Sequence, residues 1–202
     1  AAGTTSEAPV DESTDTDESA PADDPSPTST ATSIAAEPVQ EVPTGPYGSY
    51  SEAQSAFVSR VQQAQDEFDE ASNDLQQSQV LLQRNNDLCS TVGSKFENWT
   101  GVITTIGANG DGNAYIEIEI ADGVRVKTWN NSFSDFGDDT LIDSSSDLFQ
   151  TLLSIDEDSP VVFSGEFIGD GDSCVKNSNL TETFSVIDPQ FLARFTAVSP
   201  RE

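Results

Sequence analysis

The chain has 202 residues, of which 36 are Asp or Glu, 8 are Lys or Arg and none is His, so its formal net charge at neutral pH is −28. Without His, the chain has neither a Ser-His-Asp nor a Cys-His catalytic group, and no HExxH metal site. The excess of negative charge repels phosphate backbones, which proteins bind through Lys and Arg, so nucleic acid is excluded as an expected partner.

Residues 1–50 are predicted to form a disordered acidic stalk. The first 46 residues hold seven of the ten prolines and ten carboxylates, but no Lys, Arg or aromatic residue. Such a segment buries too little apolar surface to offset the entropy of ordering it. Because proline and self-repulsion both extend a chain, we favour a stalk that holds a domain away from a surface over an unselected solvated tail.

The start of the sequence suggests export. It begins at Ala1 and has no Met anywhere, as expected of a secreted protein after removal of its signal peptide, or of a truncated chain. Ala1-Ala2-Gly3 also suits the region after the acylated Cys of a bacterial lipoprotein, which suggests a peripheral membrane tether through a Cys that precedes this sequence. We therefore expect an extracytoplasmic location, at the cell surface or in the periplasm.

The two cysteines, Cys89 and Cys174, fit an oxidising compartment. An even pair in such surroundings usually forms a disulfide, and we expect one between these two residues. Two buried free thiols are the alternative. No CxxC motif accompanies them, so a thiolate metal site is not expected.

Residues 51–90 are predicted to form one long helix. Small and apolar residues repeat at alternating spacings of four and three, with no Gly or Pro between them. The residues of this seam are Phe57, Val61, Ala64, Phe68, Ala71, Leu75, Ser78 and Leu82. The pattern predicts either an intermolecular coiled coil, which would make a homo-oligomer, or a helix that packs on the domain that follows it.

Residues 91–202 carry the patterns of a small β domain. Predicted strands cover 96–106, 114–120, 124–129, 160–168 and 191–198, and residues 144–155 have helical spacing. This order is that of an OB-fold, a five-stranded Greek-key barrel with a helix between its third and fourth strands. Gly165 within the fourth strand suits a bulge or a barrel corner. We predict a mainly β fold, a small OB-like barrel preceded by the long helix and the disordered tail; a different small β-barrel is the main alternative.

Several motifs of the predicted barrel resemble a group of uncharacterised bacterial OB-like domains. The motifs are Phe96-x-x-Trp99-x-Gly101-Val102-Ile103, Lys127-Thr128-Trp129-Asn130-Asn131, Ser134-Asp135 with Thr140-Leu141-Ile142, Val162-Phe163-Ser164-Gly165-x-Phe167, Pro189-x-Phe191 and Arg194-Phe195. The resemblance covers residues 95–198. It implies an exported or lipoprotein-like chain, and it implies no defined activity.

Two candidate sites follow from the predicted fold. OB-folds bind ligands on their second and third strands, where Tyr115 and Trp129 could stack on a ligand and Arg125 and Lys127 could add charge. The alternative is that the tryptophans belong to the core. In the connection after the third strand, four carboxylates could hold Ca²⁺ through oxygen ligands, or form a solvated acidic loop. They are Asp135, Asp138, Asp139 and Asp143.

These features predict a non-catalytic, exported and surface-tethered protein. Its OB-like module would bind a protein or an oligosaccharide, such as a cell-envelope polysaccharide, with no cofactor apart from the Ca²⁺ considered above. One alternative is a structural oligomer assembled through the helix at 51–88. Another is a Ca²⁺-binding protein or a carboxylate-based enzyme that uses the acidic loop at 135–143.

Overall fold

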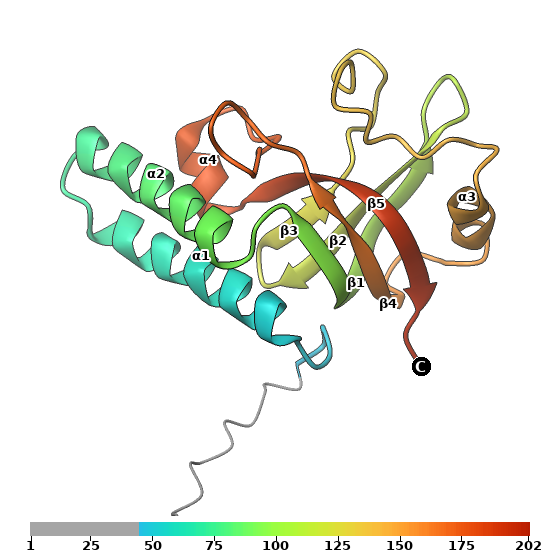
Figure 1. Ribbon diagram of the computed structural model, residues 1–202, viewed down its shortest axis with the longest axis horizontal. Helices are drawn as coiled ribbons and strands as arrows, with labels where there is room; N and C mark the ends of the chain where they lie inside the picture. The colour runs from blue at the N-terminus through green and yellow to red at the C-terminus, as the bar shows by residue number, and fades with distance from the viewer. Residues whose placement is uncertain (1–44) are drawn as a thin grey trace, which may run out of the picture. The chain divides into compact units, whose positions relative to one another are not determined.

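The computed structural model describes residues 45–202, and Figure 1 shows their arrangement. In chain order the elements are α1 (Glu52–Glu70), α2 (Asp74–Thr91), β1 (Lys95–Ala108), β2 (Ala114–Ala121), β3 (Val124–Lys127), α3 (Asp147–Leu152), β4 (Pro160–Phe167), α4 (Glu182–Ile187) and β5 (Gln190–Pro200). The stalk expected over residues 1–50 lies outside the described residues except for 45–50. Among the helices described, none has the length and apolar character needed to cross a bilayer.

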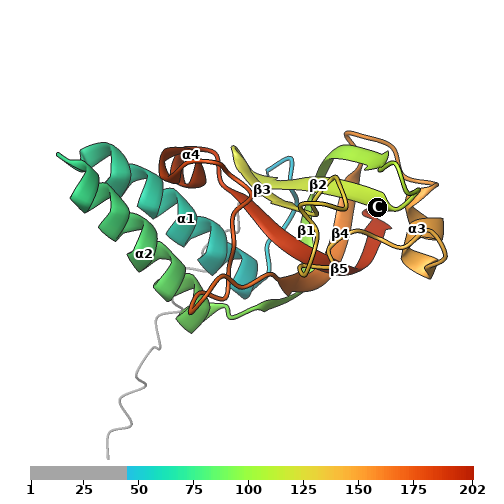
Figure 2. The ribbon, with the colours of Figure 1, turned by 90° about the horizontal axis from the view of Figure 1, so that it is seen from above.

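The five strands close into one barrel in the order β1-β2-β3-β5-β4. Neighbouring strands are antiparallel except β3 and β5, which run parallel. Buried and half-exposed residues alternate along β2: Ile116, Ile118 and Ile120 face the barrel interior, and the residues between them face outward. The predicted five-stranded barrel is therefore confirmed. Figure 2 shows α1 and α2 on one side of it and α3 on the other.

Gly165 occupies a crowded bulge, as the sequence predicted. The β4–β5 register shifts between Ser164 and Gly165, and the facing β1 shifts between Phe96 and Trp99. A Cβ at Gly165 would lie 2.4 Å from the Arg194 carbonyl oxygen, so the two backbones can approach this closely only around a glycine. The two bulges leave a surface hollow of about 440 Å³ over these strands.

The prediction of one long helix over 51–90 is wrong, because the segment forms two helices joined at residues 71–73. The Asn73 side chain caps α2 by accepting a hydrogen bond from the Gln76 amide. The Gln76 side chain in turn accepts from the Ser72 backbone N–H at 2.7 Å. These two hydrogen bonds cap a new helix start without any Gly or Pro. An ion pair between Arg60 and Asp87, at 2.8 Å, joins the two helices across the hairpin.

The two halves of the predicted seam have different environments. Phe57, Val61, Ala64 and Phe68 of α1 are all buried. Leu75 and Leu82 of α2 are instead 74% and 57% exposed. The apolar face of α1 therefore packs within its own chain, and no continuous seam is left for a coiled coil over 51–90.

Helix α1 contacts the barrel through Phe57. Its ring lies 5.1 Å from Trp99, 5.1 Å from Phe167 and 4.9 Å from Phe191, measured between centroids. Nearby, the buried Gln54 amide donates to the Thr100 carbonyl at 2.6 Å and accepts from the Thr100 N–H at 2.9 Å. Gln54 thus satisfies both backbone groups of Thr100, which lies next to the bulge in β1.

Residues 45–50 belong to the folded unit rather than to the stalk. The Tyr47 hydroxyl donates to Glu119 at 2.6 Å, and the Tyr50 hydroxyl donates to the Ile120 carbonyl. At the other end of the chain, Arg201 donates to the carbonyls of Tyr47 and Pro46. The entering segment is therefore fastened at the C-terminal end of β2.

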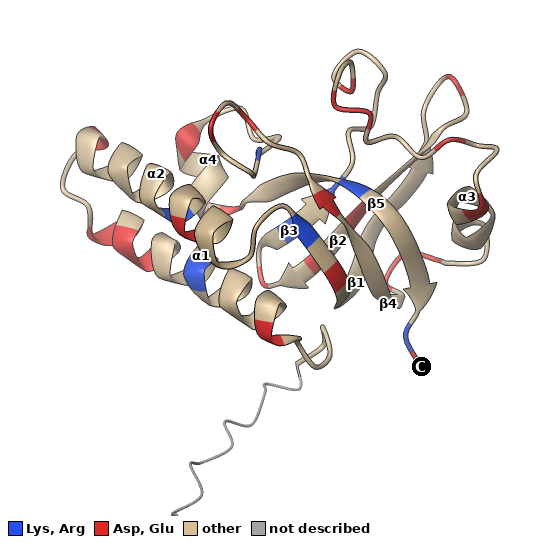
Figure 3. Cartoon of the chain, viewed as in Figure 1, with Lys and Arg blue, Asp and Glu red and all other residues tan. Residues whose placement is uncertain are grey.

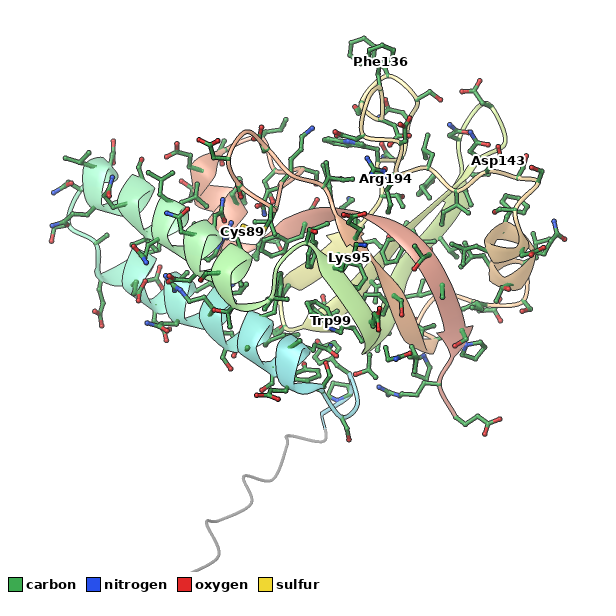
Figure 4. All side chains as sticks on the ribbon, viewed as in Figure 1. Cys89, Lys95, Trp99, Phe136, Asp143 and Arg194 are labelled. Carbon is green, nitrogen blue, oxygen red and sulfur yellow. A yellow bond between two sulfur atoms is a disulfide. The ribbon has the colours of Figure 1, made fainter. Side chains whose placement is uncertain are left out.

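Cys89 and Cys174 lie at disulfide distance, with sulfur atoms 2.09 Å apart, which confirms their predicted pairing. Cys89 is near the end of α2, and Cys174 lies in the connection between β4 and β5. Figure 4 shows Cys89 facing that connection. The disulfide therefore links the helical hairpin to the barrel.

Candidate binding surface

Three connections meet at the end of the barrel opposite residues 45–50. They are residues 109–113, 129–143 and 168–180, which we call the loop end. The Asn109 side chain donates to the Ser132 hydroxyl at 3.0 Å, which joins the first connection to the second. Lys176 pairs with Asp138 at 2.6 Å, which joins the second to the third. Figure 1 shows the 109–113 and 129–143 loops projecting beyond the strands, while the 168–180 connection runs back toward α4.

The 129–143 loop is braced from within by Asp135. This carboxylate is buried, and its Oδ1 accepts from both the backbone N–H and the hydroxyl of Thr140 at 2.6 Å. Its Oδ2 accepts from the Leu141 N–H at 3.2 Å. Asn131 adds a local turn by accepting from the Ser134 N–H at 2.9 Å. With its side chains bonded to its own backbone, the loop has a defined shape.

The braced loop exposes two phenylalanines at its tip. Phe133 is 93% exposed and Phe136 is 92% exposed, on either side of the inward-facing Asp135. Figure 4 shows Phe136 at the outermost point of the loop. Each aromatic ring carries a large apolar area, and interface residues of this type contribute much of the binding free energy when a partner covers them.

Asp138 connects the loop to the barrel. Its carboxylate accepts from the Trp129 indole N–H at 2.8 Å and from Lys176 at 2.6 Å. Its backbone carbonyl accepts from the Arg194 Nε at 2.8 Å. Burial raises the pKa of Asp138, but the bonds from Lys176 and Trp129 outweigh it and hold the pKa below its usual range. Because the folded pKa of Asp138 is lowered, its bonds to Lys176 and Trp129 stabilise the fold at pH values above the usual carboxyl pKa. This stabilisation is lost as the pH falls through the folded pKa.

The four carboxylates predicted to bind Ca²⁺ do not converge. Asp135 and Asp138 are engaged as described, and Asp143 accepts from the backbone and hydroxyl of Ser145, whose bonds lower the pKa of Asp143. Asp139 is exposed and has a left-handed backbone, with φ of 49°. Within residues 45–202, no group of three or more His, Cys, Asp or Glu side chains is arranged to hold a metal ion.

The predicted cationic residues of the barrel face are neutralised by their neighbours. Arg125 lies 3.4 Å from Glu119 and 2.9 Å from Asp188. Lys127 lies 2.7 Å from Glu117. These pairs cover the outer face of β2 and β3, so no uncompensated positive groove is present there.

The aromatic candidates have separate roles. Tyr115 packs over Gly107, where an added Cβ would lie 2.5 Å from its ring. Trp129 lies beyond the end of β3, and its indole N–H donates to the Asp138 carboxylate. Lys176 is 5.9 Å from the centroid of the indole ring. Trp99 is fully buried in the core, as its alternative interpretation required.

Sequence reasoning missed Phe133 and Phe136. Helix and strand patterns are found by periodicity, and an apolar residue in a loop has none. The available signal was compositional: both phenylalanines interrupt a run of Asn, Ser, Asp and Gly between residues 130 and 139. Such a run predicts a solvated turn, where a large apolar side chain has no core to enter.

A buried arginine lies between α2 and the β4–β5 connection. Arg84 is fully buried, and within residues 45–202 its hydrogen-bond acceptors are neutral: the Ser185 carbonyl at 2.5 Å, Asn85 at 2.9 Å and Asn177 at 3.2 Å. Among the described residues, no carboxylate forms a salt bridge with it. Burial, with some repulsion from Arg60, lowers the pKa of Arg84 to about 9, so it remains charged at neutral pH.

Replacing Asn85 by Asp should therefore stabilise the fold by about 1–2 kcal/mol, because the same Oδ1 would then carry the missing counter-charge. Urea unfolding of the full chain measures this change. Asn86→Asp, at the exposed neighbouring position, is the matched control for adding one negative charge. Equal stability of the two variants would show that the charge of Arg84 is already compensated.

No protein-family model, curated protein or solved structure matches the chain. The resemblance of residues 95–198 to bacterial OB-like domains therefore stays a prediction.

Proposed function

We propose that this protein is a non-catalytic binding module with an OB-type barrel, exported and tethered through its N-terminal segment, which holds its ligand at the loop end. The strand order β1-β2-β3-β5-β4, with α3 between β3 and β4, supports the OB assignment. OB barrels bind ligands with loops of this kind, above all those that follow their first and fourth strands.

The observation that carries this function is the exposure of Phe133 and Phe136 on a braced loop. An apolar side chain is often exposed where the backbone is mobile. Here the backbone of the turn is held by hydrogen bonds to Asp135 and Asn131. Because the backbone of the turn is already ordered, a ligand that covers the two rings restricts only their own side-chain rotamers. This is the property expected of anchor residues in a binding surface.

The attachment of the chain supports presentation of this surface. Residues 47 and 50 are bonded to Glu119 and Ile120, at the C-terminal end of β2. The 129–143 loop meets the N-terminal end of the same strand, where the Ala114 N–H donates to the Ile142 carbonyl at 2.8 Å. A tether that enters at residue 45 would therefore leave the loop end free.

The carboxylates of the acidic loop favour binding over catalysis. A glycosidase needs two carboxylates of different pKa facing each other across a cleft. Asp135, Asp138 and Asp143 are instead each bonded to groups of their own surroundings. Their bonds support a structural role in shaping the loop.

The test is loss of ligand retention in the double variant Phe133→Ser with Phe136→Ser. The immobilised full chain is presented with solubilised envelope from the producing organism and, separately, with a glycan array. We expect retention of the bound ligand to fall about tenfold or more. The free energy of unfolding should change by less than about 0.5 kcal/mol, because both positions are exposed.

The matched control is Leu75→Ser with Leu82→Ser, which removes two exposed apolar side chains from α2. This variant should retain the ligand as the unmodified chain does. If it loses the ligand while the phenylalanine variant keeps it, binding belongs to the helical hairpin and the proposed function is wrong.

A further inference from the structure

The surroundings of Phe133 and Phe136 are negatively charged. The 129–143 loop contains four Asp and no Lys or Arg, and the adjoining 109–113 loop adds Asp111. Among these carboxylates, Asp111, Asp139 and Asp143 are exposed. Figure 3 shows acidic and no basic positions on the two loops. The positive charge of the neighbouring Lys176 is already paired with Asp138. Asp139 lies three residues after Phe136, and Asp111 is bonded to Ser132 next to Phe133, so these two carboxylates form an acidic rim at the phenylalanines. Figure 4 shows Asp143 farther from Phe136, toward α3.

The polar groups of the loop are already bonded within the protein. Asp135 and Asn131 bond to the loop backbone, and Ser132 exchanges hydrogen bonds with Asn109 and Asp111. A site for an oligosaccharide needs free donors and acceptors beside its aromatic rings, because sugar hydroxyls must be paired when they leave water. This loop offers mainly apolar rings and exposed negative charge.

The same charge disfavours a membrane surface. Anionic lipids attract basic segments, and they repel a loop whose exposed charges are carboxylates. A protein surface can instead supply an apolar pocket for an aromatic anchor together with Lys or Arg around it. Its basic residues would pair with the acidic rim and would also be attracted over a distance by the net charge of the chain.

We infer that the partner of the loop end is a protein whose apolar pocket takes Phe133 and Phe136 and whose rim carries Lys or Arg that face Asp111 and Asp139. This inference rests on the proposed function, since it identifies the ligand of the same site. It assigns the phenylalanines as the anchors and the exposed carboxylates as the groups that select a basic partner.

A displayed library of random peptides, selected on the full chain and counter-selected on the Phe133→Ser, Phe136→Ser variant, tests the inference. We expect the enriched peptides to combine apolar residues with Lys or Arg. Binding of a selected peptide should weaken with added salt, because an exposed ionic rim is screened. Asp111→Asn with Asp139→Asn should weaken it about two- to fivefold, and Asp66→Asn with Asp69→Asn on α1 should leave it unchanged.

The results that would contradict the inference can be distinguished from those that would contradict the proposed function. Enriched peptides without basic residues, with salt-independent binding, would overturn the basic partner and leave the loop end as a binding surface. Phenylalanine-dependent binding to a glycan array or to phosphatidylcholine vesicles, with no enriched peptide, would likewise overturn the protein partner alone. If no peptide, glycan or vesicle distinguishes the phenylalanine variant from the unmodified chain, both the inference and the proposed function fail.

Discussion

Replacing Phe57 by Ala should lower the free energy of unfolding by about 3–5 kcal/mol. The Phe57 ring is fully buried and lies about 5 Å, between centroids, from the rings of Trp99, Phe167 and Phe191. Removing it leaves a cavity between α1 and the barrel and deletes three aromatic contacts at once. Urea unfolding of the full chain, followed by tryptophan fluorescence, measures the change, because Trp99 is in contact with Phe57.

Leu75→Ala is the control for this prediction. Leu75 belongs to the same predicted seam and the same helical hairpin, but its side chain is exposed. Its replacement should change the free energy of unfolding by less than about 0.5 kcal/mol. Comparable losses in the two variants would mean that α1 does not close the barrel core through Phe57.

Replacing both Cys89 and Cys174 by Ser should lower the free energy of unfolding by about 2–4 kcal/mol. The disulfide joins residues separated by 85 positions, so it restricts the unfolded chain over more than half of the described residues. It also connects α2 to the segment that holds Lys176, two residues after Cys174. Urea unfolding with and without a thiol reductant measures the contribution of the disulfide.

The double Ser variant provides its own control. Reductant should lower the stability of the unmodified chain toward that of the variant, and it should leave the variant unaffected. The disulfide would be contradicted if reductant did not change the stability of the unmodified chain and if its thiols reacted with an alkylating reagent before reduction. The two cysteines would then be the free thiols that the sequence left as an alternative.

The helical hairpin shows where sequence periodicity misleads. The spacing of four and three continues from Phe57 through Leu82, across the break between α1 and α2 at residues 71–73. The local signal for the break was present in Ser72, Asn73 and Gln76, which form the cap of α2. A capping signal within a long periodic run is ambiguous until packing decides whether the chain turns back.

The site could be predicted only in part. The sequence placed the acidic residues in the connection after the third strand, and that connection is indeed part of the loop end. It did not distinguish Asp135, which is buried and braces the turn, from Asp139, which is exposed. Whether each carboxylate is buried depends on which backbone N–H groups the fold brings within hydrogen-bond distance of it, and this cannot be predicted from the composition of the loop.

The sequence by itself indicated the five strands and their order along the chain, and it favoured pairing of the two cysteines over two free thiols. Alternation in β2 and β3 encodes which face is buried, and the short connections from β1 to β2 and from β2 to β3 make these strands antiparallel neighbours. Only the tertiary structure decided that Phe57 enters the core while Leu75 does not, that Arg84 is buried against the neutral acceptors Ser185, Asn85 and Asn177, and that Phe133 and Phe136 remain outside. Local patterns specify backbone conformation and amphipathic faces, whereas the burial of a single side chain depends on partners that are distant in the chain.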